Sequence, residues 1–260
     1  MLLLVAAAVA IGLLVATWVV SLVVRDASIV DLVWGLAFVV VTATVAALGG
    51  GDPARRTLLT VLVGVWGLRL SGYLAWRNLG HGEDYRYRAM RKKYGARFPL
   101  ISLATVFLLQ GALVWVVSLP VQLAAGAAGP AGLGPLAVVG VGLWAVGFAF
   151  EAVGDLQLAR FKADPASEGQ VMDRGLWRFT RHPNYFGDCC VWWGIWLACA
   201  ETGPGRWGVV GPLVMTFLLV RVSGVAMLER TIGRRRPGYA DYVARTSAFV
   251  PLPPRRRSAG

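Results

Sequence analysis

Residues 174–188, RGLWRFTRHPNYFGD, concentrate side chains that could bind an anionic ligand. They include His182, one of only two histidines in the chain, beside Arg181. Arginine guanidinium groups bind phosphate oxygens well, and Pro183 suits the first turn of a helix, whose free N–H groups attract anions. We therefore expect Arg178, Arg181 and His182 to lie near phosphate. Trp, Arg and Tyr side chains also anchor helices at the lipid headgroup level, and both interpretations can hold together.

A second group of polar residues, with the pattern E-x-x-x-D-x-Q-L-x-x-x-K, runs from Glu151 to Lys162. Glu151 and Asp155 are four residues apart, so they share one face of a helix. Two carboxylates on one face can accept hydrogen bonds from ribose hydroxyls or a carboxamide, and Lys162 can hold a phosphate. Acidic pairs at this spacing are common on ordinary helices, but this pair lies at the predicted exit of a membrane span, which favours a binding role.

The elements that must position these groups are membrane helices. Of the 260 residues, 57% are hydrophobic, and they occur in long runs such as Met1–Val24, which has no charged side chain. A helix needs about 20 apolar residues to cross a bilayer, and in lipid its backbone groups must all be paired internally. The sequence therefore predicts an all-α integral membrane protein with about seven spans, at roughly 3–24, 28–48, 57–77, 100–125, 133–160, 185–201 and 207–229.

Most of the 26 Lys and Arg residues fall on one side of these spans. If the N-terminus is outside, only Arg55, Arg56 and Arg206 lie in outward loops, whereas the loops at 78–99 and 161–184 and the tail are rich in basic residues. Cytoplasmic loops carry the excess of Lys and Arg in membrane proteins. The pattern predicts an N-out, C-in topology in a plasma membrane, such as the bacterial inner membrane. It also explains the net charge of +12 without a nucleic-acid partner.

Ionisable side chains within the spans predict a polar cavity. Each such group costs on the order of a few kcal/mol to insert, so it suggests a function by default. Most of them lie toward the cytoplasmic ends of their spans, which favours a cavity that opens inward and is closed to the outside. The alternative is a set of buried salt bridges that pair Arg69 or Arg221 with Asp31, Asp155 or Asp188. The complete set is Asp31, Arg69, Glu151, Asp155, Asp188, Arg221 and Glu229.

Two further groups of reactive side chains favour a plain structural role. The sequence GEDYRY at 82–87 could supply an acid, since carboxylates can orient a buried tyrosine hydroxyl, but its mixture of charges favours a solvated loop. Cys189, Cys190 and Cys199 fall in one predicted membrane helix, which is typical of apolar packing. No second ligand at metal-binding spacing accompanies His182, so we expect no metal site.

Taken together, these motifs resemble the steroid 5-alpha-reductase superfamily, most closely its bacterial branch, which is typed by a domain of unknown function. The segment GLWRFTRHPNYFGD followed by VWWG, with the upstream acidic motif, carries the resemblance in the C-terminal half. The resemblance covers nearly the whole chain. Its other parts are DLVWG at 31–35, WGLRLSGYLAWR at 66–77, GEDYRY at 82–87, LLQG at 108–111, VSLP at 117–120, RVSGVAMLE at 221–229 and YADYVARTSAFVP at 239–251.

The resemblance implies a seven-helix membrane reductase that binds NADPH in a cytoplasm-facing cavity and passes a hydride to the carbon–carbon double bond of an enone-bearing, sterol-like lipid. It implies one membrane domain, in which residues 1–126 form the substrate pocket and residues 127–260 bind the cofactor. The expected cofactor-binding residues either fall on cofactor-contacting positions of the family or belong to the motifs above. They are Glu151, Asp155, Lys162, Arg178, Arg181, His182, Asn184, Tyr185, Asp188, Arg221 and Glu229.

The sequence departs from the family at the pair of residues that polarises the substrate carbonyl. The steroid reductases use a Glu on the second helix and a Tyr on the third. Here Trp66 occupies the Tyr position, and Asp31 is the nearest second-helix acid. The catalytic candidates are therefore Asp31, Tyr73, Tyr85 and Tyr87, and the departure puts a steroid substrate in doubt.

A different enzyme class fits part of the same pattern. Integral membrane methyltransferases that use S-adenosylmethionine on isoprenylcysteine or phospholipids share an RHPxY segment before a helix, a Glu near the end of the last span and a Tyr-rich tail. Residues 181–185, Glu229, Tyr239 and Tyr242 match that pattern. The acidic motif at 151–162 and the long N-terminal half favour the reductase. A non-enzymatic lipid-binding protein is a third interpretation, and the clustered charges within the spans argue against it.

Overall fold

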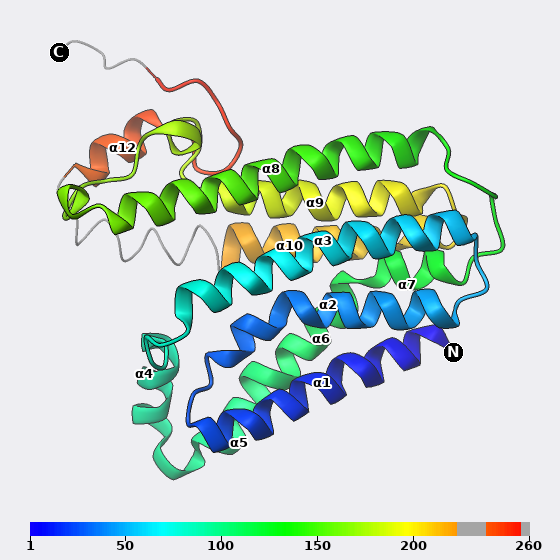
Figure 1. Ribbon diagram of the computed structural model, residues 1–260, viewed down its shortest axis with the longest axis horizontal. Helices are drawn as coiled ribbons and strands as arrows, with labels where there is room; N and C mark the ends of the chain where they lie inside the picture. Colours follow the sequence, from blue (N-terminus) through cyan, green and yellow to red (C-terminus); the bar gives the residue numbers. More distant parts are fainter. Residues whose placement is uncertain (223–237, 256–260) are drawn as a thin grey trace. The chain divides into compact units, whose positions relative to one another are not determined.

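The computed structural model describes residues 1–222 and 238–255, and Figure 1 shows their helices. Within these residues the regular elements are all helical, apart from one isolated bridge between Thr180 and Ser247. The α-helices are α1 (Leu2–Val24), α2 (Ile29–Leu48), α3 (Pro53–Asn78), α4 (Tyr85–Tyr94), α5 (Phe98–Ser102), α6 (Leu109–Val117), α7 (Leu119–Ala125), α8 (Pro135–Ala163), α9 (Pro183–Ala200), α10 (Val210–Phe217) and α12 (Tyr239–Arg245). Short 3-10 helices cover Gly95–Arg97, Pro165–Ser167, Gly175–Arg178 and Gly205–Val209, and π-helical turns cover Leu103–Leu108 and Leu218–Val222.

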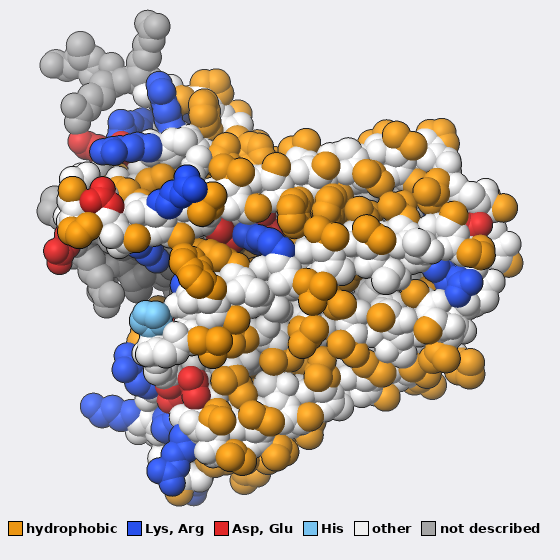
Figure 2. Space-filling model, viewed as in Figure 1, with side chains coloured by type: hydrophobic (Ala, Val, Ile, Leu, Met, Phe, Trp, Pro, Cys, Tyr) orange, Lys and Arg blue, Asp and Glu red, His pale blue; other side chains and the backbone are white. Residues whose placement is uncertain are grey.

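The outer surfaces of these helices are largely apolar. Leu4, Leu68 and Val138 are among many large hydrophobic side chains that are exposed, and Figure 2 shows such side chains over much of the visible surface. Apolar surface of this extent suits lipid better than water. Six stretches of the described chain are long and apolar enough to cross a membrane, namely Leu2–Val24, Ile29–Leu48, Pro53–Asn78, Tyr85–Val117, Pro135–Ala163 and Gly205–Val222. The prediction of an all-α membrane protein is confirmed.

The span predicted at 185–201 corresponds to α9, which is not among these six stretches. Asn184 lies in its first turn and Asp188 follows one turn later, so its apolar run is shorter than the helix. The span predicted at 207–229 is described as far as Val222. The count of seven spans and the N-out, C-in topology therefore stay predictions.

The single span predicted at 100–125 is interrupted in the structure. At Ser118 the backbone leaves the helical conformation (φ −81°, ψ 3°), and both its N–H and its hydroxyl donate to the Val114 carbonyl, at 3.1 and 2.6 Å. Pro120, which has no N–H to donate, lies in the first turn of α7. The apolar run is thus divided into a helical stretch that ends with α6 and the short helix α7, because the chain turns where a serine can close one helix and a proline can begin the next.

The described chain forms two compact units. Unit 1 contains residues 1–138 and 195–211, and unit 2 contains residues 139–194 and the residues from 212 onward. Helices α8, α9 and α10 each contribute residues to both units.

These units do not coincide with the halves predicted at 1–126 and 127–260. Residues 195–211 belong with the N-terminal helices because they pack closely on them. A Cβ atom added at Gly208, for example, would collide with the backbone of Pro120. Only a glycine allows this approach, so the chain beyond α9 packs tightly against the start of α7.

In unit 1, α2 and α3 pack through a pair of glycines. A Cβ atom at Gly35 would lie 2.5 Å from the Gly67 carbonyl oxygen, and the Leu36 N–H donates to the Ser71 hydroxyl at 2.9 Å. Beside this contact Phe38 and Trp66 are fully buried, with ring centroids 5.5 Å apart in an edge-to-face arrangement. Trp66 therefore serves as a core residue.

In unit 2, α8 and α9 run side by side over much of their length (Figure 1). A Cβ atom at Gly187 would lie 2.5 Å from the Glu151 nitrogen and from the Gly147 oxygen. One at Gly194 would lie 2.5 Å from the Gly140 oxygen. These small residues let the two backbones approach closely, as is usual for helices packed in membranes. The same approach fixes the start of α9 against the acidic part of α8.

Candidate functional site

The segment before α9 is held against α8 by hydrogen bonds. Trp177 is buried, and its indole N–H donates to the Gly154 carbonyl at 3.0 Å. The Leu176 N–H donates to the Gln157 side-chain oxygen at 3.0 Å. From the tail, the Tyr242 hydroxyl donates to the Trp177 carbonyl at 2.6 Å, and burial raises the pKa of this hydroxyl above its usual value. The motif at 174–188 is thus a fixed part of unit 2.

The two acids of α8 face the beginning of α9. Glu151 is 3% exposed and Asp155 is 5% exposed, which confirms that they share one buried face. The Asn184 side-chain amide donates to Asp155 Oδ1 at 3.2 Å, and Pro183 packs against Gly154. Burying two carboxylates is costly unless hydrogen bonds or cations compensate them. The structure therefore brings together three of the residues predicted to bind a nucleotide.

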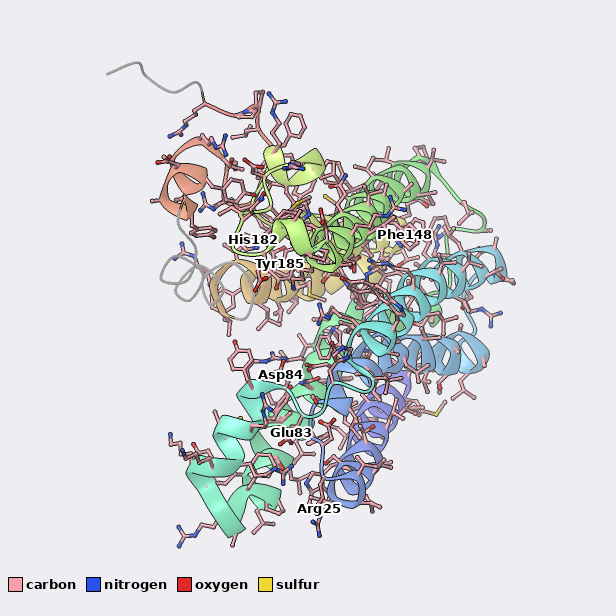
Figure 3. The ribbon with its side chains drawn as sticks, turned by 60° about the vertical axis from the view of Figure 1, so that its left-hand side comes forward. Arg25, Glu83, Asp84, Phe148, His182 and Tyr185 are labelled. Carbon is pink, nitrogen blue, oxygen red and sulfur yellow. The ribbon has the colours of Figure 1, made fainter. Side chains whose placement is uncertain are left out.

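His182 and Tyr185 form a stacked pair at the start of α9. Their ring centroids are 5.4 Å apart with an interplanar angle of 8°, and Figure 3 shows the two side chains next to each other. His182 is buried and Tyr185 is half-buried. Two stacked rings therefore lie at the first turn of α9. Among the described residues no cluster of His, Cys, Asp or Glu could hold a metal ion.

Arg181 has a structural role that the sequence did not predict. Its guanidinium Nη1 donates to the carbonyls of Val243 and Thr246, at 3.2 and 2.7 Å, and its backbone N–H donates to the Ser247 carbonyl. The last carbonyls of a helix carry partial negative charge, so a cation at the end of α12 is stabilising. Arg181 thus fastens the tail to the motif.

The other predicted cofactor-binding residues occupy more open positions. Lys162 and Arg178 are exposed, at the end of α8 and in the 3-10 turn before α9. Asp188 is half-buried on α9, and Arg221 is exposed in the π-helical turn after α10. Glu229 lies outside the described residues.

In unit 1 the structure joins Asp31 to Tyr87. The Tyr87 hydroxyl donates to Asp31 Oδ1 at 2.9 Å, although the two residues are 56 positions apart. Arg86 donates to the other oxygen of Asp31 at 2.7 Å and, through Nε, to Asp84 at 2.9 Å. Tyr87 is only 6% exposed. The alternative that paired Asp31 with Arg69 or Arg221 is not the arrangement seen, because Asp31 pairs with Arg86 at the start of α4.

The expectation of a solvated loop at 82–87 is also wrong. The Ala27 N–H donates to Glu83 at 2.9 Å, the Asp84 N–H donates to the Ser28 hydroxyl at 3.2 Å, and Arg91 bonds both oxygens of Glu83. Burial would raise the pKa of the Glu83 carboxyl, but these hydrogen bonds and the Arg91 charge hold it below its usual range. Figure 3 shows Glu83 and Asp84 close together before α4.

The other two tyrosine candidates lie elsewhere. Tyr85 is 59% exposed on α4, which is a poor position for a buried acid. The ring of Tyr73 contacts two cations, with the guanidinium carbons of Arg69 and Arg77 at 5.5 and 5.6 Å from its centroid. Of the catalytic candidates, the structure therefore combines Asp31 with Tyr87. Arg86, which completes this group, was missed, and its position beside a tyrosine in a charged run was the only sequence signal.

Unit 1 also contains a buried ion pair that the sequence pattern did not predict. Arg55 is 1% exposed, and its guanidinium lies 2.9 Å from a carboxylate oxygen of Glu201. The same carboxylate accepts the N–H groups of Gly134 and Leu136, so it caps the first turn of α8. This pair links the start of α3 to the ends of α8 and α9 that belong to unit 1.

The comparisons with known proteins give a family. No curated protein matches the chain, and no solved structure matches it. A family model described as "Protein of unknown function (DUF1295)" matches residues 17–246. The matched region includes the Asp31–Tyr87 pair of unit 1 and the α8–α9 residues of unit 2. Because it covers most of the 260 residues, the chain belongs to this family of proteins of unknown function, DUF1295.

Proposed function

We propose that this chain is a membrane-embedded reductase that uses NADPH to reduce the carbon–carbon double bond of a hydrophobic enone or sterol-like lipid, as its resemblance to the steroid 5-alpha-reductase superfamily implies. The observation that carries the proposal is the 2.9 Å hydrogen bond from the Tyr87 hydroxyl to Asp31. Enone reduction needs a donor that polarises the carbonyl oxygen. Tyr87 supplies from α4 the tyrosine that is missing at Trp66.

The residues gathered in unit 2 have the chemistry that a NADPH site needs. Glu151 and Asp155 can accept hydrogen bonds from ribose hydroxyls or the carboxamide, and the Asn184 amide can both donate and accept. Lys162 is seven residues beyond Asp155 on α8, a rise of about 10 Å along the helix, and like Arg178 it is exposed. We assign the carboxylates and Asn184 to the nucleoside parts, and the two cations to the phosphates. When bound, NADPH would supply the hydride that adds to the β-carbon, and the Tyr87 hydroxyl would supply the proton that converts the enolate to the enol.

Tyr87 is the group assigned to the substrate carbonyl. An ionised carboxylate only accepts hydrogen bonds, so Asp31, whose second oxygen accepts from Arg86, can orient the hydroxyl but cannot replace it as donor. Rotation of the hydroxyl hydrogen from Asp31 to the carbonyl oxygen is the required movement. Because Tyr87 is buried, its hydrogen bond to the developing enolate oxygen is worth more than it would be in water.

The test is ligand-dependent thermal stability of the purified protein in detergent. NADPH at 100 times its dissociation constant should stabilise the fold by about 2.7 kcal/mol, and NADH and S-adenosylmethionine should stabilise it much less. Lys162→Ala should weaken NADPH protection, whereas Lys92→Ala, which changes an exposed lysine of α4, should not. Protection by S-adenosylmethionine without protection by NADPH would refute the proposal.

One observation favours a second candidate, an S-adenosylmethionine-dependent membrane methyltransferase. The RHPNY segment that such enzymes share is held rigidly here, through Arg181 and the stacked pair of His182 and Tyr185. The Asp31–Tyr87 pair has no role in methyl transfer. The two candidates therefore differ in the expected effect of Tyr87→Phe, which should slow reduction strongly but leave methyl transfer unchanged.

A further inference from the structure

A groove of about 350 Å³ lies in unit 1 where α2 ends and α3 begins. Small and apolar side chains line it on the α2 side, and α3 contributes hydroxyl groups and one cation. The lining residues are Ala46, Ala47, Pro53, Arg56, Thr57, Thr60 and Val61. None of them takes part in the groups assigned above to cofactor or substrate, so the groove raises a separate question.

The cation of this groove is held in a fixed position. Arg56 donates from Nε to the Gly51 carbonyl at 3.0 Å and from Nη1 to the Ala46 carbonyl at 2.6 Å. Neither bond uses Nη2, and no carboxylate among the described residues forms an ion pair with Arg56. The nearby acid, Asp52, accepts instead from the N–H groups of Arg55 and Gly132. The positive charge of Arg56 is therefore anchored and uncompensated.

The groove is polar at one end and apolar at the other. Thr57 is exposed beside Arg56 in the first turns of α3. Val61, which is 53% exposed, lies eight residues beyond Pro53, about 12 Å further along α3. Both helices are candidate membrane spans, so the polar end lies where the spans end and the apolar end lies within a span. This arrangement matches a phospholipid, whose phosphate lies at the membrane surface and whose acyl chains extend into the bilayer.

We propose that the groove binds one anionic phospholipid of the surrounding bilayer, with its phosphate at Arg56 and Thr57 and an acyl chain against Val61. Phosphate oxygens accept the remaining guanidinium and hydroxyl hydrogens. A choline headgroup would place a second cation near Arg56, whereas a glycerol headgroup adds only hydroxyls. The site therefore prefers phosphatidylglycerol to phosphatidylcholine.

The test is native mass spectrometry of the full chain in detergent, titrated separately with phosphatidylglycerol and phosphatidylcholine. We expect one tightly retained phosphatidylglycerol and at least several-fold less retained phosphatidylcholine. Arg56→Gln should weaken phosphatidylglycerol retention roughly fivefold, the effect of one basic side chain at an anionic lipid surface. Ala47→Trp, which fills the groove but leaves the Arg56 hydrogen bonds in place, should weaken it similarly. This second variant keeps the test valid if Arg56→Gln disturbs the loop.

The matched control is Arg206→Gln, which removes an exposed arginine outside the groove. It should leave retention of phosphatidylglycerol unchanged. Equal retention of the two lipids, an equal loss in Arg206→Gln, or full retention in Ala47→Trp would each overturn the proposal. Because the readout is lipid retention, the result does not depend on whether the chain is a reductase.

Discussion

Replacing Arg55 with methionine should destabilise unit 1 severely. The guanidinium group is almost fully buried and donates to the carbonyls of Gly132, at 2.8 Å, and Ala198, and to the Glu201 carboxylate, at 2.9 Å. Methionine retains an apolar stem but has no donor. The change therefore leaves two carbonyls and one carboxylate short of a partner in a region closed to water.

The expected magnitude follows from the contacts that remain. Removing one partner of a buried ion pair costs about 3–5 kcal/mol. Glu201 keeps the N–H groups of Gly134 and Leu136, at 3.0 and 2.9 Å, which partly compensate its charge. We therefore expect a loss near the lower end, about 3 kcal/mol. Glu201→Gln should cost a similar amount, about 3 kcal/mol, because its amide oxygen still accepts hydrogen bonds but the buried Arg55 cation loses its counter-charge.

The assay is denaturant-induced unfolding in detergent micelles, followed by tryptophan fluorescence. Five proteins are compared, namely the wild type, Arg55→Met, Glu201→Gln, the double variant and the control Arg206→Gln. Contacting charges should give a coupling free energy of about 0.5–3 kcal/mol. The reasoning is refuted if Arg55→Met loses no more stability than Arg206→Gln, or if the effects of the two changes simply add.

Three further predictions concern the other contacts. Tyr87→Phe should lower the reduction rate about 10²- to 10⁴-fold and leave NADPH protection intact. Tyr85→Phe should change neither. If the two variants lower the steady-state reduction rate equally, Tyr87 does not have its assigned role. Gly187→Ala should lower the free energy of unfolding by about 1–3 kcal/mol, because its Cβ atom would lie 2.5 Å from backbone atoms of α8. In the same unfolding assay, Gly12→Ala should be neutral or slightly stabilising, because its Cβ atom would meet open space. The pKa of Glu83 is lowered by folding from its ordinary 4.5, so its ionised form stabilises the fold above that pH and the benefit is lost as the pH falls. Glu83→Gln should therefore lower the melting temperature at neutral pH, and the difference from the wild type should shrink as the pH falls below the ordinary pKa of 4.5 and through the lowered pKa of the folded state. A difference that stays constant as the pH falls would contradict the linkage.

Local spacing predicted part of the candidate site correctly. The interval of four between Glu151 and Asp155 places both on one face whatever the tertiary structure, and burial of both side chains confirms it. Cys189, Cys190 and Cys199 are likewise buried and reduced in α9, as their position in an apolar run implied. These features depend only on helical periodicity, which the sequence contains directly.

The Asp31–Tyr87 pair could not be predicted in this way. Its partners are 56 positions apart, and their meeting depends on how the chain between them folds back. Two hydrogen bonds fix that return, one from the Ala27 N–H to Glu83 and one from the Asp84 N–H to the Ser28 hydroxyl. Mixed charges in GEDYRY look like a solvated loop when they are read alone. Their hydrogen-bonding groups gain partners in the structure only when the start of α2 lies beside them.

The structure also separates two kinds of arginine within one motif. Arg181 donates hydrogen bonds to the carbonyls at the end of α12, so removing its guanidinium group should first loosen the tail. Arg178 is exposed, and its charge is open to solvent or a ligand. A phosphate site built on residues 174–188 would therefore depend on Arg178 through its charge and on Arg181 through the shape of the segment. Sequence spacing treats the two alike, and they are distinguished by the exposure of Arg178 and by the hydrogen bonds of Arg181.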